Sequence, residues 1–306
     1  MYRVYRFRVA NLLRSSLKKS RLPIAGTIGR ALVILLISGF LGAALIRLAP
    51  GSDVDEQELD PRLSKASVES LRRERALRDN PLQFYLHYLG GLLRGDAGQS
   101  SLFSRPVSAL IGERLPVTIR SVAAGLVAGW CAAVLLAAAS VLGRSIAVVF
   151  MSTLVSGALI SVPAAVLAIL CLLLDLPPAA AIAAVVFPRI FPHAYQQLRA
   201  GLDKPYVTMA RARGLSNMRV FFWHIVPGTL GPIVALAGVS ISLALGTSIP
   251  VEALADSAGV GQLAWRAALA RDLPLLVGIT LLLTAVTVAA NLLSDIAIAR
   301  LPGPKL

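Results

Sequence analysis

The histidine and cysteine side chains of this 306-residue sequence, which could ligate a metal or carry out redox chemistry, are few and widely separated. His87, His193 and His224 are its three histidines, and they fall in three different predicted segments. A shared metal site is therefore not expected, and we interpret each as an interfacial or packing histidine. Cys131 and Cys171 lie inside apolar runs without metal-ligand spacing, so they indicate packing residues rather than a disulfide or a redox pair.

Signatures of nucleotide binding and of hydrolysis are absent from the sequence. It has no G-x-x-x-x-G-K-[ST] loop to hold phosphates, no H-E-x-x-H zinc motif and no Ser-His-Asp arrangement. Glu252 and Asp272 do not form a convincing acid–base pair, and a solvated loop salt bridge, such as one from Arg271 to a neighbouring acid, is the default. The chain is therefore not expected to be an enzyme or to hold a cofactor.

The composition is that of an integral membrane protein. Hydrophobic residues make up 56% of the chain and charged residues only 15%, which leaves too little polar surface for a soluble globule of this size. A net charge of +14 would suggest nucleic acid in a soluble protein, but the basic residues here flank apolar runs. Membrane lipid is therefore the expected partner of these charges, and no nucleic acid is expected.

The apolar runs predict an all-α membrane protein with six transmembrane helices and both termini in the cytoplasm, as the positive-inside rule favours. Pro116 suits the first turn of the second span, and Pro188 and Pro192 are expected to break the short fourth span. Arg189 in that span should point toward the inner surface or be paired, because an unpaired cation at mid-bilayer is costly. The predicted spans are residues 27–49, 116–140, 146–174, 178–195, 228–250 and 273–299.

The remaining segments divide the chain around these spans. Residues 1–26 are rich in Arg and Lys and contain no acid, so they predict a retained basic cytoplasmic tail. Residues 50–115 predict an extracytoplasmic loop with interfacial helices, among them 81–93, whose tyrosines suit a membrane boundary. Residues 116–300 are the predicted five-helix core, and 301–306 are the C-terminal tail.

Between the fourth and fifth spans a polar, basic stretch, residues 203–227, predicts two short helices joined at a glycine. Asp203 can cap the first helix and Pro205 suits its first turn, whereas Gly214 ends it and Ser216 can cap the second helix. Such an element lies along a membrane surface. The residues that share one face of the first helix are Tyr206, Met209, Ala210 and Arg213.

Part of this stretch resembles a known family. The residues that carry the resemblance are Tyr206, Ala210, Arg211, Arg213, Gly214, Leu215, His224 and Pro227. They are similar to the cytoplasmic coupling loop of ABC-importer permeases, in the variant of the dipeptide, oligopeptide and nickel permeases, where the loop inserts into a cleft on the ATPase subunit. Thr208 and Met209 stand where the general family has Glu and Ala. An amphipathic loop that rests on anionic lipid is the alternative interpretation.

Two further loops resemble the same family. Residues 95–100, Gly-Asp-Ala-Gly-Gln-Ser, are similar to the Gly-Asp-Leu-Gly-x-Ser turn that closes its first external loop, with Ala97 in place of leucine. Residues 251–274 contain Val-Glu, Gly-x-Gly-x-Leu and Arg-Asp-x-Pro in the order found in the family loop that precedes the last span. There Ser257 and Ala258 replace the usual aromatic residue and proline.

The resemblance implies the permease subunit of an ATP-driven importer in the bacterial cytoplasmic (inner) membrane, which forms the pathway for peptides or a similar small solute by alternating access. It implies as partners a second permease subunit, two cytoplasmic ATPase subunits that bind the ATP, and an extracytoplasmic solute-binding protein. The coupling residues would then transmit force rather than do chemistry.

Other interpretations remain open from the sequence alone. A non-transporting membrane scaffold could dock a cytoplasmic partner through residues 203–227. A secondary carrier fits less well, because acidic residues are nearly absent from the span centres. A small polar face of the fifth span is interpreted as helix packing or as part of the pathway, and its residues are Ser240, Thr247 and Ser248.

Overall fold

The computed structural model describes residues 24–48, 81–143 and 145–300. The predicted tail residues 1–23 and 301–306 and the loop residues 49–80 lie outside this range. Within it, the pairing of extended backbone is limited to one bridge between Gln99 and Pro106, so the all-α prediction is confirmed for these residues. The helices are α2 (Ile24–Leu48), α4 (Pro81–Leu93), α5 (Val107–Gly143), α6 (Ile146–Ser161), α7 (Ala164–Leu173), α8 (Pro178–Leu202), α9 (Pro205–Ala212), α10 (Asn217–Val220), the π-helical turn η2 (Phe221–Ile225), α11 (Val226–Leu254), α12 (Val260–Leu269) and α13 (Leu273–Arg300).

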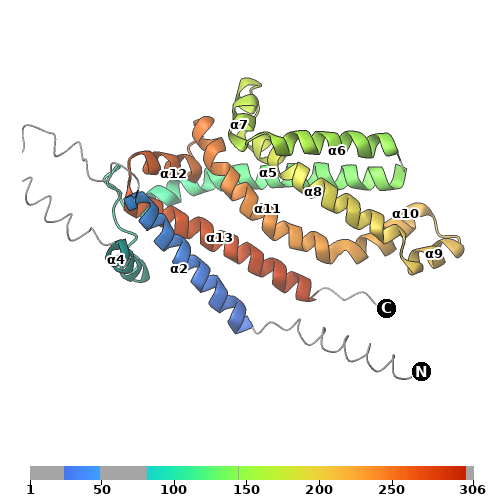
Figure 1. Cartoon of the computed structure of the whole chain (residues 1–306), viewed down its shortest axis with the longest axis horizontal. Helices are drawn as coiled ribbons and strands as arrows, with labels where there is room; N and C mark the ends of the chain where they lie inside the picture. The colour runs from blue at the N-terminus through green and yellow to red at the C-terminus, as the bar shows by residue number, and fades with distance from the viewer. Residues whose placement is uncertain (1–23, 49–80, 144, 301–306) are drawn as a thin grey trace, which may run out of the picture.

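The long helices form a bundle that extends along the longest dimension of the molecule (Figure 1). α4 and α12 lie at one end of the bundle, and α9 and α10 lie at the other. α8 contacts α5, α6, α7 and α11. It is therefore the central helix, and it leads directly into the short helices at the second end.

Several described helices suit a membrane. Three are long and apolar enough to cross one: Val107–Gly143, the continuous run Asn217–Leu254, and Leu273–Arg300. The pair α6 and α7 would make a fourth if it acts as one bent span, and the apolar part of α2, Gly29–Leu45, is shorter. The described chain is therefore that of a multi-pass membrane protein, whereas the count of six spans stays a prediction.

The third predicted span, residues 146–174, is not one straight helix. α6 ends at Ser161 and α7 begins at Ala164, and the two helices meet at 105°. Pro163 explains the bend, because proline lacks a backbone N–H and forces the preceding residue out of the helical conformation. Val162 is accordingly extended, with φ −91° and ψ 125°. The apolar run predicts a continuous span, and this proline overrides it.

Three other prolines lie inside helices instead of beginning or breaking them. Pro116 lies in the interior of α5, which begins at Val107. Pro188 and Pro192 lie inside α8, which runs without a break to Leu202. The positions predicted for these prolines are therefore wrong. In a membrane a helix satisfies its own backbone groups, and neighbouring helices help to hold a turn that contains proline.

The main core lies where α5 and α8 pack together, and two glycines of α5 allow the close approach. A Cβ atom added at Gly125 would lie 2.7 Å from Cβ of Ile182, and one added at Gly129 would lie 3.0 Å from Cβ of Val186. Lipid tails are as apolar as the helices, so close packing rather than burial from water favours helix association in a membrane. The glycines thus provide the contact that positions α8.

α4 begins and ends at the residues predicted from the sequence, and its tyrosines pack between helices. Tyr85 and Tyr88 are buried against α2 and α13, in a small core with Ala43 and Val277. Neither phenolic oxygen has a hydrogen-bond partner in the structure. The sequence predicts that both lie at a membrane boundary, which stays a prediction, and the structure adds that the rings pack between helices.

Gly125→Ala is expected to lower the thermal stability of the protein in detergent, because the new methyl group would overlap Ile182. Overpacking of this kind costs about 1–3 kcal/mol. Gly112→Ala is the matched control, since Gly112 lies in the same helix with open space around it. Thermal unfolding followed by circular dichroism compares the two variants, and equal midpoints would contradict the close contact.

Tyr88→Phe is expected to change how stability depends on alkaline pH. Burial, with a smaller effect of the Asp96 carboxylate, raises the pKa of Tyr88 from 10.0 to about 12. The unfolded chain therefore loses the phenolic proton first, so the stability that Tyr88 contributes is complete below pH 10.0 and is lost as pH rises toward 12. The variant should lose less stability over this window, as measured by unfolding midpoints against pH. Parallel curves for the two proteins would refute the shift.

Candidate functional site

The segment predicted to couple the protein to a partner forms one end of the described molecule (Figure 1). α9 and α10 are joined by a turn at Gly214, whose φ of +78° is a conformation that residues with side chains rarely adopt. Ser216 caps α10, because its hydroxyl accepts a hydrogen bond from the backbone N–H of Arg219 at 3.4 Å. The two short helices, the glycine junction and the serine cap agree with the prediction.

The start of the first short helix differs from the prediction. The N-cap residue of α9 is Lys204, which makes no side-chain cap, so the predicted cap by Asp203 is wrong. Asp203 is instead the C-cap of α8. The physical reason is that α8 continues to Leu202. Asp203 therefore ends α8, and the next residue, Lys204, takes the N-cap position of α9.

α9 buries only part of the face predicted from the sequence. Val207 and Ala210 are buried in the main core, next to Phe221 of the turn η2, whereas Tyr206 and Met209 are exposed. A helix of two turns contacts its neighbours along one narrow stripe, and the i and i+3 positions Val207 and Ala210 form it here. Ala210 therefore fixes α9 to the bundle, and Tyr206 is available to a partner.

The other predicted coupling residues divide between exposed and half-buried positions. Arg213, Gly214 and Pro227 are exposed, and Leu215 is half-buried. Arg211 and His224 are also half-buried, and the Nε atom of Arg211 and the Nδ1 atom of His224 are buried without a hydrogen-bond partner in the structure. The structure thus brings these residues to one end of the molecule.

The second short helix is not separate from the fifth span. α10, η2 and α11 form one continuous run, and the backbone N–H of Val226 bonds to the carbonyl of Phe221 in the manner of a π-helix. Pro227 follows directly after this turn and cannot donate a backbone hydrogen bond, which fits the change from π to α geometry there. A movement of this end of the molecule would therefore pass directly into α11.

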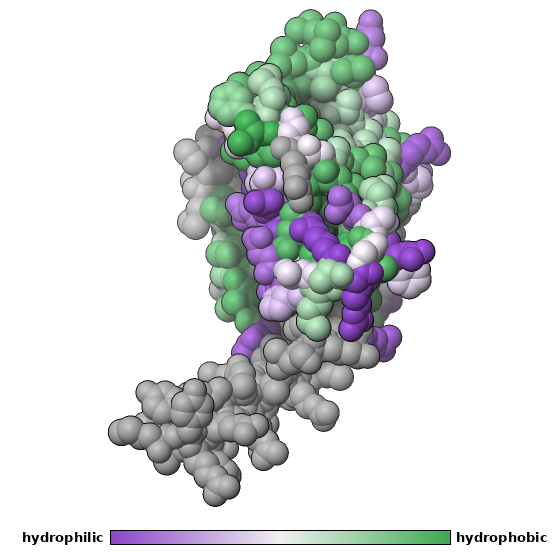
Figure 2. Space-filling view, turned by 90° about the vertical axis from the view of Figure 1, so that its right-hand side faces the viewer, coloured by the Kyte–Doolittle hydropathy of each residue, from purple (hydrophilic) through white to green (hydrophobic). Residues whose placement is uncertain are grey.

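The surface of this end is hydrophilic and mostly basic. Figure 2 looks onto it and shows hydrophilic side chains gathered beside apolar surface. Lys204, Arg213 and Arg219 are exposed there, and Asp203 is the single acid in residues 203–227. Such a surface attracts an acidic protein surface or anionic lipid, and it offers no group arranged for catalysis.

The opposite end contains the carboxylate of Glu252, which is buried although the sequence predicts that it lies in a solvated loop. Glu252 lies in the last turn of α11 and is completely buried. Its Oε2 atom accepts hydrogen bonds from the Thr118 hydroxyl at 3.0 Å and from the backbone N–H of Gly261 at 2.7 Å. The Thr118 oxygen in turn accepts from the N–H of Val260 at 2.7 Å. One carboxylate thus links α5, α11 and the start of α12.

Asp272 forms a second link at the same end, and it too is buried rather than solvated. It accepts hydrogen bonds from the Ser100 hydroxyl, from the backbone N–H of Leu102 at 3.0 Å, and from the N–H of Leu275 at 3.2 Å. The last of these caps α13. The two loops that resemble the same family are therefore joined to each other, which the sequence could not indicate because Ser100 and Asp272 are far apart in it.

The small polar residues of the predicted fifth span, which lies in α11, are buried. Ser240, Thr247 and Ser248 are buried, and each donates a hydrogen bond to a backbone carbonyl of its own helix. Ser240 also accepts one from the indole N–H of Trp130 at 2.9 Å. These contacts favour helix packing over a pathway role for the three residues.

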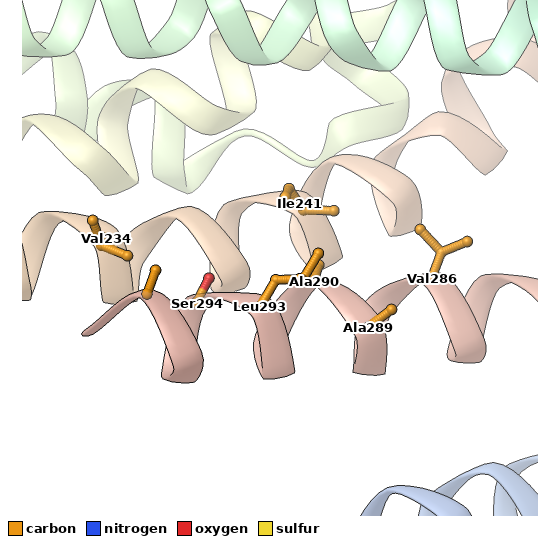
Figure 3. Close-up of a pocket in the computed structure, with 8 residues that line it drawn as sticks. Val234, Ile241, Val286, Ala289, Ala290, Leu293 and Ser294 are labelled. Carbon is orange, nitrogen blue, oxygen red and sulfur yellow. The ribbon is translucent and has the colours of Figure 1, made fainter. Parts of the chain in front are cut away.

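An open groove runs between α11 and α13, with a volume of about 450 Å³. Figure 3 shows Val234 and Ile241 of α11 on one side and Val286, Ala290 and Leu293 of α13 on the other. Ser294 is the polar residue of its lining. The groove therefore suits an apolar neighbour and provides no catalytic group.

Arg189 lies near the middle of α8 and is exposed. The ion pairs found among the described residues, such as Arg105 with Glu113 and Arg266 with Asp256, do not include it. Of the two predicted alternatives, pairing is not found within the described part of the chain, and orientation toward the inner surface stays a prediction. If α8 crosses a membrane, as predicted for residues 178–195, an arginine near its centre costs about 2.5–3.5 kcal/mol unless water or another polar group lies beside it.

These features define a class of protein: a helical multi-pass membrane protein without a catalytic arrangement in its described residues, fixed by buried polar links at one end and exposing a basic segment at the other. No group of His, Cys, Asp and Glu side chains in the described ranges could hold a metal ion. The family described as binding-protein-dependent transport system inner membrane component matches residues 125–302, and the chain belongs to this family. The resemblance seen in the loops is confirmed.

Individual relatives are similar over most of their length. A protein of Brucella suis biovar 1 (strain 1330), named as a peptide transport system permease, is 30% identical, covering 88% of this chain and 94% of that protein. The oligopeptide transport system permease protein AppB of Bacillus subtilis (strain 168) is 25% identical, covering 87% and 93%. The nickel import system permease protein NikB of Staphylococcus aureus (strain MRSA252) is 24% identical, covering 87% and 86%. The chain is thus a non-catalytic permease component of the bacterial inner membrane.

Thr118→Val is expected to destabilise the end of the bundle at which Glu252 is buried. The change keeps the shape of the side chain but leaves the Glu252 carboxylate and the Val260 N–H each without one bond, at a cost of about 1–3 kcal/mol. Thr118→Ser keeps the hydroxyl and is the matched control. Unfolding midpoints in detergent should fall more for the valine variant, which loses both bonds, than for the serine variant, which loses only a methyl group. A valine variant as stable as the wild type would contradict the link.

Proposed function

We propose that this chain is the permease subunit of an ATP-driven importer and forms part of the membrane pathway for peptides or a similar small solute. The observation that carries the proposal is the segment from α9 to η2, a pair of short helices with exposed basic residues at one end of a long helix bundle. The names of the relatives, which include peptide, oligopeptide and nickel permeases, support the class of solute.

The proposed arrangement has six spans, formed by α2, α5, the bent pair α6–α7, α8, α11 and α13, with both termini in the cytoplasm. Figure 1 supports this topology, because the start of α2, the link between α5 and α6, the α9–α10 segment and the end of α13 all lie toward the same end. The exposed basic residues at this end also agree with the excess of Lys and Arg in cytoplasmic loops.

The proposed partners are a second permease, two cytoplasmic ATPase subunits that bind the ATP, and an extracytoplasmic solute-binding protein. ATP closes the ATPase dimer, and the exposed side of α9 with Tyr206, Arg213 and Gly214 moves with it. Val207 and Ala210 share a core with η2, so the base of α11 follows α9. Alternating exposure of the pathway then results from the rotation or tilt of the spans.

Arg211→Glu and Arg213→Glu are expected to weaken docking of the ATPase subunits, because each reverses a charge on the basic surface. Arg213 is exposed, so its variant tests docking without disturbing the core. Arg94→Glu is the matched control, since Arg94 is exposed beside α4 at the opposite end. The measurement is affinity purification of the chain from gently solubilised membranes, with identification of the proteins that come with it.

The wild-type chain and Arg94→Glu should retain a second permease and the ATPases, whereas the other two variants lose the ATPases and keep the permease. If the wild-type chain purifies alone, or with partners that bind no nucleotide, the scaffold or secondary-carrier interpretation replaces the importer.

A further inference from the structure

The face of α8 that carries Arg189 continues as a polar strip. Arg189, His193 and Gln196 are exposed, and at about 100° per residue they fall on one side of the helix; we name these three residues the α8 strip. On the other sides, Ile190 and Phe191 are buried in the main core. The α8 strip, in the second half of the helix, therefore lies on the face that the rest of the described chain leaves exposed.

The position of the strip along the helix is informative. α8 runs from Pro178 to Leu202, where it leads into the segment proposed to be cytoplasmic. Arg189 is near the midpoint of the helix, and His193 and Gln196 follow in the next two turns toward Leu202. In the proposed orientation the α8 strip thus extends from mid-membrane toward the cytoplasmic surface.

Three different hydrogen-bonding side chains on successive turns favour an aqueous surface over a single contact with a neighbouring subunit. One ion pair with a second subunit would satisfy Arg189 but would leave His193, one turn further inside the predicted span 178–195, in contact with lipid, where polar groups are unfavourable. A water-filled passage satisfies all three, and ionisable residues inside membranes commonly mark such passages. The α8 strip is therefore best accounted for as the wall of a pathway.

We infer that the α8 strip lines the inner half of the solute pathway and binds an anionic group of the solute, such as the C-terminal carboxylate of a peptide. The inference rests on the proposed function and adds the chemical class of the solute. A guanidinium matches a carboxylate with two parallel hydrogen bonds, and His193 and Gln196 can donate further bonds as the solute moves inward. A bare divalent cation would be repelled by Arg189, so the strip favours an anionic solute over an unchelated metal ion.

The test uses the complete transporter in proteoliposomes, with its second permease, ATPases and solute-binding protein. The probes are trialanine with a free carboxylate and trialanine with a C-terminal amide, and each initial rate of ATP-dependent uptake is divided by the wild-type rate for the same peptide, so that any preference of the binding protein cancels. Arg189→Gln should lower uptake of the free acid about tenfold, as expected for the loss of a charged hydrogen bond, and leave uptake of the amide unchanged. Arg189→Lys should retain most of the free-acid uptake.

Arg199→Gln is the matched control, because Arg199 is exposed on the same helix but lies about 80° around from Arg189. It should change neither rate. Equal effects of Arg189→Gln on the two peptides, or no effect on either, would overturn the inference while leaving the proposed function intact. Loss of the second permease from the Arg189→Gln complex would also overturn it, in favour of an ion pair between subunits. A wild-type complex that transports neither peptide would contradict a peptide as the solute, and with it the inference.

Discussion

The close contact of α5 with α8 is the interaction on which the rest of the structure depends. In lipid, two apolar helices gain little by hiding from their solvent, so the geometry of contact decides which helices associate. Gly125 and Gly129 let α8 approach the backbone of α5, and α8 then serves as the surface against which α6, α7 and α11 pack. The position of the basic segment at the end of α8 follows from the same contact.

The two ends of the bundle are held by different kinds of force. At one end Glu252 and Asp272 accept hydrogen bonds from several elements at once, which specifies a single arrangement of α5, α11, α12 and α13. At the other end α9 is held by the small apolar stripe of Val207 and Ala210. A segment with few buried contacts is the part of a protein that moves at low cost. The end with Glu252 and Asp272 is therefore expected to be rigid, and α9 at the other end is expected to move more easily.

The sequence predicted those features that depend on neighbouring residues. The cap by Ser216, the junction at Gly214 and the bounds of α4 are local signals, and they agree with the structure. The burial of Glu252 was not predictable, because its partner Thr118 is distant in the sequence. The family resemblance placed that glutamate in a loop, and only the packing of α12 against α5 and α11 removes it from water. The interior prolines differ for the same reason, since neighbouring helices rather than local propensity decide where they are tolerated.

The turn η2 determines how α11 can rotate. A π-helical turn holds one more residue than an α-helical one, and in a continuous helix an extra residue rotates everything that follows by about 100°. The bond from Val226 to Phe221 therefore determines the rotation of α11 about its own axis. This rotation decides which side of α11 faces Trp130 and which side lines the groove with α13. A change between π and α geometry at this turn would therefore rotate α11 about its own axis and shift it along that axis by about 1.5 Å, the rise of one residue.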